Sequence, residues 1–275
     1  MIRIVGDSSL DLTEEFHHGE FVAKVPFRIM LDGVEWRDTP DIDMEAFRKA
    51  MSEAKHFQTA CGSPQEFYDI YDGEGDVFAL TITSKLSGSY NAAVLGKQLY
   101  QQDYPDKKIH VVDTLSTSTA AALIYMKIRE LIDKKISFEE IRDEAEALAK
   151  SMRTFFISQS LENLRKAGRL SNIAGIIGKL LRFMPVMGSD NGVIVPYGIA
   201  RGKKRAFEKL VDLIEEKAEN VTEKVLAISH ADNLEDALKL KETIKQRIRF
   251  KAIHILPMGA LNTLYADVKG IVVSF

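Results

Sequence analysis

The chain has 275 residues, 45% of them hydrophobic and 28% charged, a composition typical of a globular protein of roughly two domains. Lysine and arginine number 37 against 40 aspartate and glutamate, and this net charge of -3 argues against the broad phosphate contact of nucleic-acid binding. A single cysteine, Cys61, permits no internal disulfide, and no apolar run approaches the ~18 residues that cross a membrane, so we expect a cytoplasmic protein.

The first half of the chain alternates strand-like and helix-like segments. Each strand candidate is a short apolar run that ends in polar turn residues. Residues 21–38 break this rhythm, because they predict two short strands around an Asp32-Gly33 hairpin turn. Repeated strand–helix alternation predicts an α/β fold with a parallel sheet covered by helices on both faces. The expected strands are 2–5, 77–83 and 109–112, and the expected helices are 44–54, 119–134 and 138–152, the last capped by Ser137.

The pattern changes around residue 153. We therefore predict an N-terminal α/β domain with a hairpin insertion, 1–153, and a C-terminal α/β domain with a smaller mixed sheet, 154–275. A glycine-punctuated apolar segment, 173–188, lies before the turn Asp190-Asn191-Gly192. The expected strands of this half are 155–160, 193–200, 225–229, 252–256 and 270–275, and its expected helices are 161–167, 207–218 and 234–247.

The most informative stretch is ITSKLSGSYNAA, residues 82–93, which follows an apolar strand and opens a helical pattern. A Ser/Gly turn at such a place leaves unpaired N–H groups and a partial positive charge, which suit a carboxylate or phosphate. Hydroxyls of Thr83, Ser84, Ser87 and Ser89 surround it. The spacing matches neither the phosphate-binding P-loop nor the G-x-S-x-G turn of hydrolases. The alternative is that these serines only cap the helix.

Polar clusters stand at the ends of four predicted strands, namely 6–9, 83–89, 113–118 and 229–232. Ligands of open α/β sheets bind outside the carboxyl ends of the strands, so we expect the first three clusters to gather along one edge. A loop before the strand at 77–83 adds the hydroxyls of Thr59 and Ser63. Asp7 and Asp113 belong to these clusters, with capping of the following turn as the alternative role for each.

No histidine shows the spacing of a metal site, and we predict neither a metal nor a cofactor. His230, at a predicted strand end, is the histidine that could touch a ligand. We expect Cys61 to be an inert small residue, since nothing adjacent supplies a cation to lower its pKa. Arg169 and Arg201 lie near predicted turns, where either could face an anionic ligand or partner, or could simply be solvated.

Seven of these segments, in this order, resemble motifs of the DegV family of bacterial fatty acid-binding proteins, from residue 2 to about residue 260. GDSSLDL resembles the family's TDS-x-x-DL, TACGSP its TSQPSP, and TSKLSGSYNAA its SS-x-LSGTYQSA. The other four are VPFRIMLDGVEWRD, which lies between the first two, and VVDT, KAGRLS and RFMPVMGSDNG, which follow the third. One departure is that Leu261, in GALNTLY, stands where the family carries the His of GAH-x-GPG. Leu261 cannot supply the head-group contact of that histidine.

The resemblance implies two α/β domains with a fatty acid tunnel between them. It also implies that Thr59 and Ser87 bind the carboxyl head, with the backbone N–H groups of Gly88 and Ser89 nearby. Arg201 would be the family arginine, and a separate fatty acid kinase would phosphorylate the bound acid. The residues predicted to line the tunnel, or alternatively to pack between the domains, are Ile173, Ile176, Ile177, Leu180, Leu181 and Met184.

The leading hypothesis is a non-catalytic carrier that binds a long-chain fatty acid or a related acyl lipid and presents its carboxyl to a partner such as a kinase. One alternative is an enzyme that uses Ser84 or Ser87 as a nucleophile, with His230 near in space. Another is a module that binds a small anion or a phosphosugar at the same turns. Nucleic acid is not an expected partner, and peripheral membrane contact is compatible with the sequence.

Overall fold

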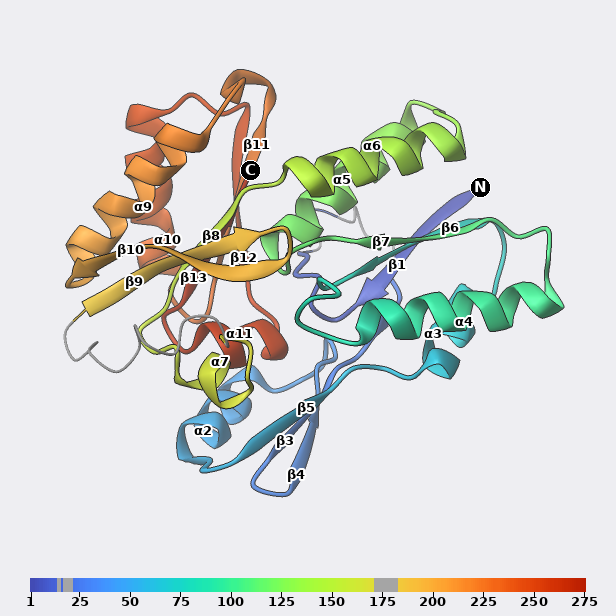
Figure 1. Cartoon of the computed structure of the whole chain (residues 1–275), viewed down its shortest axis with the longest axis horizontal. Helices are drawn as coiled ribbons and strands as arrows, with labels where there is room; N and C mark the ends of the chain where they lie inside the picture. Colours follow the sequence, from blue (N-terminus) through green and yellow to red (C-terminus); the bar gives the residue numbers. More distant parts are fainter. Residues whose placement is uncertain (14–15, 17–21, 171–182) are drawn as a thin grey trace.

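The structure is a computed structural model, and it describes residues 1–13, 16, 22–170 and 183–275 (Figure 1). Within these ranges the strands form a four-stranded parallel sheet, a six-stranded mixed sheet and a three-stranded antiparallel sheet. The order of the parallel sheet is β2 (Lys24–Val25), β1 (Ile2–Asp7), β6 (Asp76–Thr81) and β7 (Ile109–Asp113).

Helices cover both faces of the parallel sheet, because successive strand residues point to opposite sides. In β6, Val77 and Ala79 pack against α3 and α4, whereas Phe78 and Leu80 pack against α5 and α6. The predicted parallel sheet with helices on both faces is therefore confirmed. The helices are α3 (Pro64–Tyr71), α4 (Ser89–Asp103), α5 (Thr119–Asp133) and α6 (Phe138–Ser151).

The six-stranded sheet is mixed, as predicted, but it is the larger of the two sheets, so the prediction of a smaller one is wrong. Strand β9 is not predicted from the sequence, because Pro185 and Gly188 are residues that usually interrupt a strand. Pairing with β10 on one side and β8 on the other holds β9 extended through both residues. The strand order is β10 (Val193–Arg201), β9 (Phe183–Asp190), β8 (Thr154–Ile157), β13 (Ile271–Ser274), β11 (Val225–His230) and β12 (Ala252–Pro257).

Different helices pack on the two faces of the six-stranded sheet. Phe155 and Ile157 of β8 point into a core shared with α9 and α10. Phe156, between them, points to the other face and packs with Leu164 of α7. The helices of this half are α7 (Glu162–Lys166), α9 (Lys203–Lys217), α10 (Leu234–Arg247) and α11 (Ala260–Ala266), with a short 3-10 turn, η1 (Val221–Glu223).

The third sheet contains the predicted hairpin, with Asp32 and Gly33 in its turn. A third strand, β5, pairs with β3, so the predicted loop at 59–64 is wrong for Thr59 and Ala60, which end that strand. Its strand order is β4 (Val34–Arg37), β3 (Arg28–Leu31) and β5 (Phe57–Ala60), and α2 (Met44–Glu53) precedes β5.

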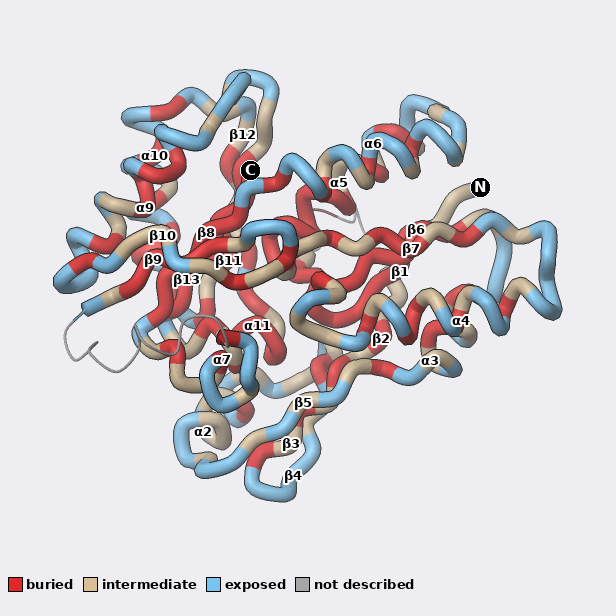
Figure 2. The backbone as a smooth tube through the Cα atoms, viewed as in Figure 1, coloured by how far each residue is buried: buried red, intermediate tan, exposed pale blue. Residues whose placement is uncertain are grey.

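Helix α5 connects the halves of the chain, since one buried cluster contains its alanines together with Leu80 of β6, Ala227 of β11 and Leu256 of β12. Figure 2 shows buried backbone running through the strands of both large sheets and through this helix. The predicted domain boundary at residue 153 falls directly before β8, and the division itself stays a prediction. In the described part of the chain no helix is long and apolar enough to cross a membrane.

The turn between β9 and β10 is a second contact between the halves. Thr83 donates a hydrogen bond from Oγ1 to the Gly192 carbonyl at 3.3 Å, and Ser189 donates from Oγ to the Leu115 carbonyl at 2.8 Å. Gly192 has a φ of +85°, and a Cβ there would lie 2.2 Å from Thr83 Oγ1. Only glycine fits this close approach without moving the loop at 83–89.

Gly192→Ala is expected to lower the free energy of unfolding by about 2 kcal/mol, because it adds a steric overlap to the cost of a positive φ. Gly33→Ala is the matched control. Gly33 has a φ of +90° in a similar turn, but nothing lies within 4 Å of its Cβ position, so about 1 kcal/mol is expected. Urea unfolding measures both variants, and equal losses would contradict the close contact between the halves.

Candidate functional site

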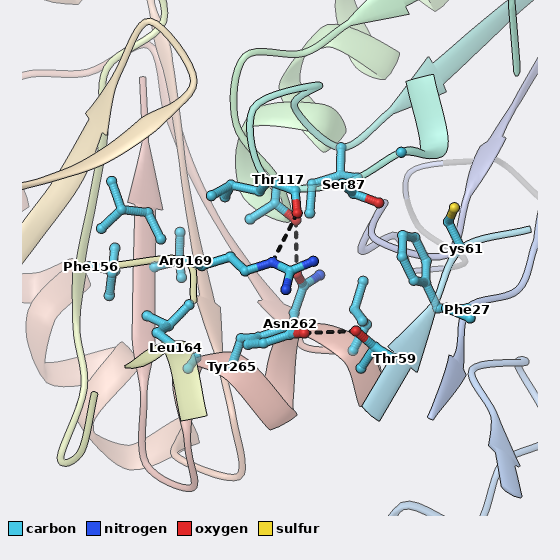
Figure 3. Close-up of a pocket in the computed structure, with 18 residues that line it drawn as sticks. Phe27, Thr59, Cys61, Ser87, Thr117, Phe156, Leu164, Arg169, Asn262 and Tyr265 are labelled. Carbon is cyan, nitrogen blue, oxygen red and sulfur yellow. Dashed lines mark hydrogen bonds between the residues drawn. The ribbon is translucent and has the colours of Figure 1, made fainter. Parts of the chain in front are cut away.

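A cavity of about 290 Å³ lies between the carboxyl edge of the parallel sheet, the third sheet and the open face of the six-stranded sheet (Figure 3). This volume is close to the lower end of the range for small-molecule sites. The wall is mostly apolar, and its apolar members come from both halves of the chain. They include Phe27, Ile82, Leu86, Phe156, Leu164, Ile194, Leu261 and Val272.

Two pairs of hydrogen-bonded side chains interrupt the apolar wall, and each joins the first half of the chain to α11. Thr59 Oγ1 and the Tyr265 hydroxyl share a hydrogen bond of 2.7 Å. Thr117 donates from Oγ1 to Oδ1 of Asn262 at 2.8 Å. Figure 3 shows both pairs at the cavity, with the Arg169 guanidinium beside the second. The cavity therefore combines an apolar wall with hydroxyl and amide groups.

The predicted Ser/Gly turn supplies another part of the wall through Ser87 and Gly88. The Ser87 amide donates to the Thr83 carbonyl at 3.3 Å, and the Ser89 amide donates to Ser87 Oγ at 3.2 Å. The Gly88 amide has no hydrogen-bond acceptor among the described residues. Gly88 is exposed and is the N-cap of α4, so its N–H is the group of this turn that can meet an anionic or carbonyl oxygen.

Ser89 turns away from the cavity. Its hydroxyl donates to Oδ2 of Asp7 at 2.6 Å, and both residues are fully buried. Asp7 also accepts from the Ile82 amide at 3.0 Å and from the Ser9 amide at 3.1 Å, so it joins the ends of β1 and β6 to the start of α4. Burial raises the pKa of Asp7, against the effect of these hydrogen bonds. Asp7 thus caps its own turn, the alternative role predicted for it, and also positions the Ser/Gly turn.

The three polar clusters of the first sheet meet at its carboxyl edge, as predicted. The Ser84 amide donates to Asp113, with its nitrogen 3.2 Å from Oδ1, and the Thr83 amide donates to the Ser116 carbonyl at 2.9 Å. Asp113 also accepts from the Leu115 amide at 3.1 Å, which is the capping role predicted as its alternative. Ser84 does not line the cavity.

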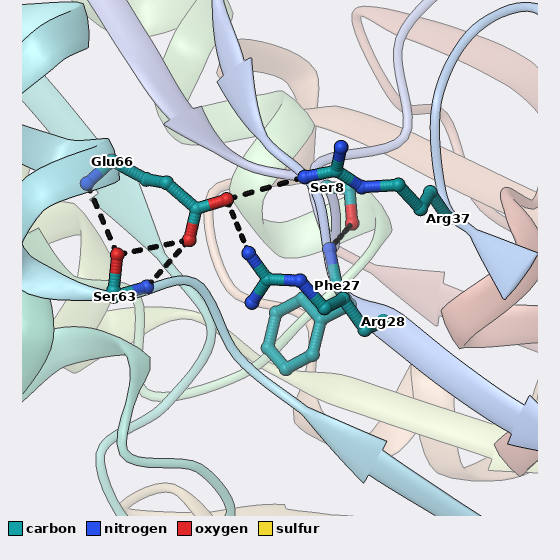
Figure 4. A network of polar contacts seen from close by, with 6 residues as sticks. All are labelled: Ser8, Phe27, Arg28, Arg37, Ser63 and Glu66. Carbon is teal, nitrogen blue, oxygen red and sulfur yellow. Dashed lines mark hydrogen bonds and ion pairs between the residues drawn. The ribbon is translucent and has the colours of Figure 1, made fainter. Parts of the chain in front are cut away.

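Ser63 lies outside the cavity wall and caps α3, in the capping-box arrangement with Glu66. Glu66 in turn pairs with Arg28 at 2.6 Å and Arg37 at 3.3 Å, which joins α3 to the third sheet (Figure 4). Figure 4 also shows the Phe27 amide donating to Ser8 Oγ, at 3.0 Å. This network holds the segment between β2 and β3, from which Phe27 reaches the cavity.

Ser63→Ala is expected to lower the free energy of unfolding by about 1 kcal/mol, since one cap is lost, and to leave ligand affinity within about twofold of wild type. Ser137→Ala removes the equivalent capping box of α6 and is the matched control. The prediction of Ser137 as the N-cap of this helix is confirmed. Thermal unfolding and ligand titration of both variants provide the measurement. A tenfold loss of affinity in Ser63→Ala alone would return Ser63 to the binding site.

Arg201 ends β10, is exposed and does not line the cavity. Arg169 does line it, and its Nε donates to the Leu86 carbonyl at 3.1 Å. Its Nη1 donates to the Ala167 carbonyl. Of the predicted tunnel residues, Met184 packs with the core on the α9 and α10 side of the sheet. Ile173, Ile176, Ile177, Leu180 and Leu181 lie outside the described residues.

Leu261 is 1% exposed and lines the cavity beside Phe27 and Ile82. His230 accepts the Asn233 amide through Nδ1 at 3.1 Å, and no histidine lines the described wall. Burial raises the pKa of Cys61, which does line the cavity, so its thiol stays protonated at neutral pH. Among the described residues no group of three or more His, Cys, Asp or Glu side chains could hold a metal ion.

Thr117, Asn262 and Tyr265 were not predicted from the sequence as site residues, although the last two belong to the GALNTLY stretch. Tyr265 follows Leu261 by four positions, so a helix at 260–266 places both on one face. That spacing was the available signal for Tyr265. Nothing in the sequence pairs Thr117 with Asn262, which are 145 positions apart.

Comparison with known proteins bears on this site. A family model described as an uncharacterised protein of the DegV family matches residues 1–275. A DegV domain-containing protein of Streptococcus pneumoniae is 31% identical over 278 residues, which cover 99% of this chain and 98% of that protein. A solved DegV family structure from Ruminococcus gnavus, described with vaccenic acid, has a TM-score of 0.95 at 31% identity, covering 100% of this chain and 99% of that one.

A second solved structure is the fatty acid kinase B3 protein of Streptococcus pneumoniae, loaded with linoleic acid. Its TM-score is 0.92 at 28% identity, and the match covers 100% of this chain and 99% of that one. A third, a DegV family protein from Eubacterium eligens loaded with heptadecanoic acid, has a TM-score of 0.92 at 27% identity, with the same coverage. The family model and the relatives of 31% identity extend over the whole chain, which therefore belongs to the DegV family.

Proposed function

We propose that this chain binds one long-chain fatty acid in the cavity and presents its carboxyl group to a partner. The observation that carries the proposal is a mostly apolar cavity whose polar groups include Ser87, Gly88 and Thr59, three residues of the predicted carboxyl site. Family members with solved structures carry vaccenic, heptadecanoic and linoleic acid. The proposal treats residues 1–153 and 154–275 as two domains with the acid held between them.

The acyl chain supplies most of the binding energy in this proposal. About 14 methylenes at ~0.8 kcal/mol each contribute roughly 11 kcal/mol before the cost of ordering the ligand. The helix N-terminus at Gly88 adds little beside this, because its interaction is worth only ~0.3–1 kcal/mol even for a fully charged group, and ~2 kcal/mol where partly buried. The tail therefore sets affinity, and the head-group contacts set which end of the acid faces Gly88.

The partner in this proposal is a fatty acid kinase, as the name of the Streptococcus pneumoniae relative indicates for that protein. Gly88 is exposed, which leaves the head-group end within reach of a second protein. Leu261 removes one head-group contact but leaves the Thr59–Tyr265 pair on the same wall. We place this carrier in the cytoplasm of a bacterium, where a kinase has its nucleotide, and cell fractionation tests that location.

The apolar wall favours the acyl ligand over the alternative of a small anion or phosphosugar, which needs a polar pocket. The alternative of a serine enzyme needs a general base, and the described cavity wall holds no histidine near Ser87. These observations support the carrier over both alternatives.

Titration of the delipidated chain with oleic acid tests the binding step, with inorganic phosphate as competitor. We expect one acid per chain and no competition by phosphate. Addition of a bacterial fatty acid kinase and ATP to the loaded protein then tests presentation, with an acyl phosphate as the expected product. Failure to bind oleic acid, or displacement of it by phosphate, would reject the proposal.

A further inference from the structure

Three buried carboxyl groups support the wall of the cavity, and each bonds to a residue of that wall. Asp7 accepts from the Ile82 amide at 3.0 Å, Asp11 from Asn262 Nδ2 at 2.9 Å, and Asp38 from the Leu261 amide at 3.2 Å. Their exposed fractions are 0%, 4% and 7%. Three acidic side chains therefore lie directly behind the wall residues that a ligand carboxyl in the cavity would contact.

Two cations lie near the three carboxyl groups and the wall. Lys24 is half-buried and interacts with all three, and it donates from Nζ to the Leu10 carbonyl at 2.6 Å. Arg169, the cation of the described cavity wall, donates from Nε and Nη1 to backbone carbonyls and keeps its positive charge, but it is exposed, so water screens that charge. Burial raises the pKa of the Cys61 thiol, another titratable group of the wall, so this thiol is neutral at pH 7. The Tyr265 hydroxyl also belongs to the wall and shares its hydrogen bond with Thr59.

Burial already disfavours charge in this region. It raises the pKa of Asp11 to about 6, raises the pKa of Asp7 and Asp38, and lowers the pKa of Lys24. A ligand carboxyl that moves from water into the cavity also loses hydration, which raises its pKa. Negative charge nearby raises that pKa further.

The Thr117–Asn262 pair is oriented to accept a hydrogen bond from a protonated group. Both N–H bonds of the Asn262 amide are used, one by the Ser9 carbonyl at 2.8 Å and one by Asp11. Its Oδ1 accepts the Thr117 hydroxyl, so that hydroxyl proton is also used. What remains toward the cavity is lone pairs on Thr117 Oγ1 and Asn262 Oδ1, which are acceptors.

Building on the proposed function, we propose that the fatty acid is bound with its carboxyl group protonated, its O–H donated to the Thr117–Asn262 pair, and that Asp11 is the positioning residue that keeps this pair an acceptor. The carbonyl oxygen of the acid then accepts a hydrogen bond from the Gly88 amide. The turn of Gly88 and the loop of Thr117 are adjacent, since the Thr83 amide donates to the Ser116 carbonyl at 2.9 Å.

Binding in this form takes up a proton at neutral pH, because a carboxyl group free in water is ionised there. Affinity therefore falls about tenfold for each unit of pH between the pKa of the free acid and that of the bound acid. This dependence follows from the ligand itself, so it distinguishes the neutral acid from a carboxylate held at the same place.

The experiment uses oleic acid labelled with ¹³C at its carboxyl carbon, bound to the delipidated full chain at pH 7. We expect the bound carboxyl resonance at the position of the protonated acid, and calorimetry in buffers of different ionisation enthalpy to give uptake of about one proton per acid. A bound resonance at the carboxylate position without proton uptake would overturn the inference. Absence of any bound resonance would instead reject the proposed function on which it rests.

Asp11→Asn tests the positioning role. It removes one negative charge and presents an N–H₂ group to Asn262, whose amide then turns to donate to Thr117. We expect the pKa of the bound acid to fall by at least one unit, about a tenfold change. Asp76→Asn is the matched control, because Asp76 lies at the opposite, amino end of β6 and accepts the Lys108 amide at 3.1 Å. Equal shifts in both variants, or none in Asp11→Asn, would contradict the role of Asp11.

Discussion

Gly88→Trp is expected to weaken fatty acid binding by about 100-fold. Gly88 has a φ of -75°, which any residue can adopt, and the nearest atom to a Cβ there is Cys61 Sγ, at 3.7 Å. Because Cys61 lines the cavity, a side chain at position 88 grows into the polar end. An indole there displaces three or four methylenes at ~0.8 kcal/mol each, about 3 kcal/mol in total.

Gly88→Ala is the graded control for this prediction. A methyl group at position 88 makes only an ordinary contact with Cys61, so affinity is expected to stay within about threefold of wild type. Titration of both delipidated variants with oleic acid, together with their thermal unfolding, separates blocked binding from lost stability. Wild-type affinity in Gly88→Trp would place the head group elsewhere.

Asp11→Asn is expected to change how stability depends on pH by about 3 kcal/mol. The pKa of Asp11 is about 6 in the folded chain against 3.8 for the free side chain, so the folded state binds this proton more tightly. The contribution of the protonated carboxyl is fully present below about pH 3.8 and is lost as the pH rises through about 6. A difference of about two pKa units corresponds to about 3 kcal/mol.

Urea unfolding at pH 4 and pH 7 measures this effect as a difference between wild type and Asp11→Asn. The wild type should lose about 2 kcal/mol relative to the variant between the two pH values, since the variant has no carboxyl at this position and the rest of the effect lies below pH 4. Asp76→Asn, at the amino end of β6, controls for the general effect of removing one acidic group. A difference that is independent of pH would show that Asp11 titrates normally.

The local parts of the fold were predictable from the sequence. The Asp32-Gly33 hairpin, the Ser137 cap and the helices after β6 and β7 depend on turn chemistry and on residue periodicity, which a sequence displays directly. Strand β9 was not predictable in this way. Its Pro185 and Gly188 are tolerated because the neighbouring strands β8 and β10 hold the backbone extended.

The candidate site was predictable only where one continuous segment supplies it. Ser87 and Gly88 follow from the position of the Ser/Gly turn between β6 and α4. Thr117 and Asn262 do not, because their hydrogen bond exists only after the two halves have packed around α5. Ser63 and Ser89 show the opposite error. Their hydroxyl groups suit a ligand, but Glu66 and Asp7 use them in the folded chain.

Native mass spectrometry of the freshly purified protein, followed by extraction and identification of any bound lipid, tests the central claim most directly. The account predicts a mass increment of one long-chain fatty acid per chain, lost on delipidation and restored by added oleic acid. It also predicts that Gly88→Trp, purified in the same way, lacks that increment while Gly88→Ala keeps it. A wild-type protein that carries no lipid and takes up none from solution would contradict the account.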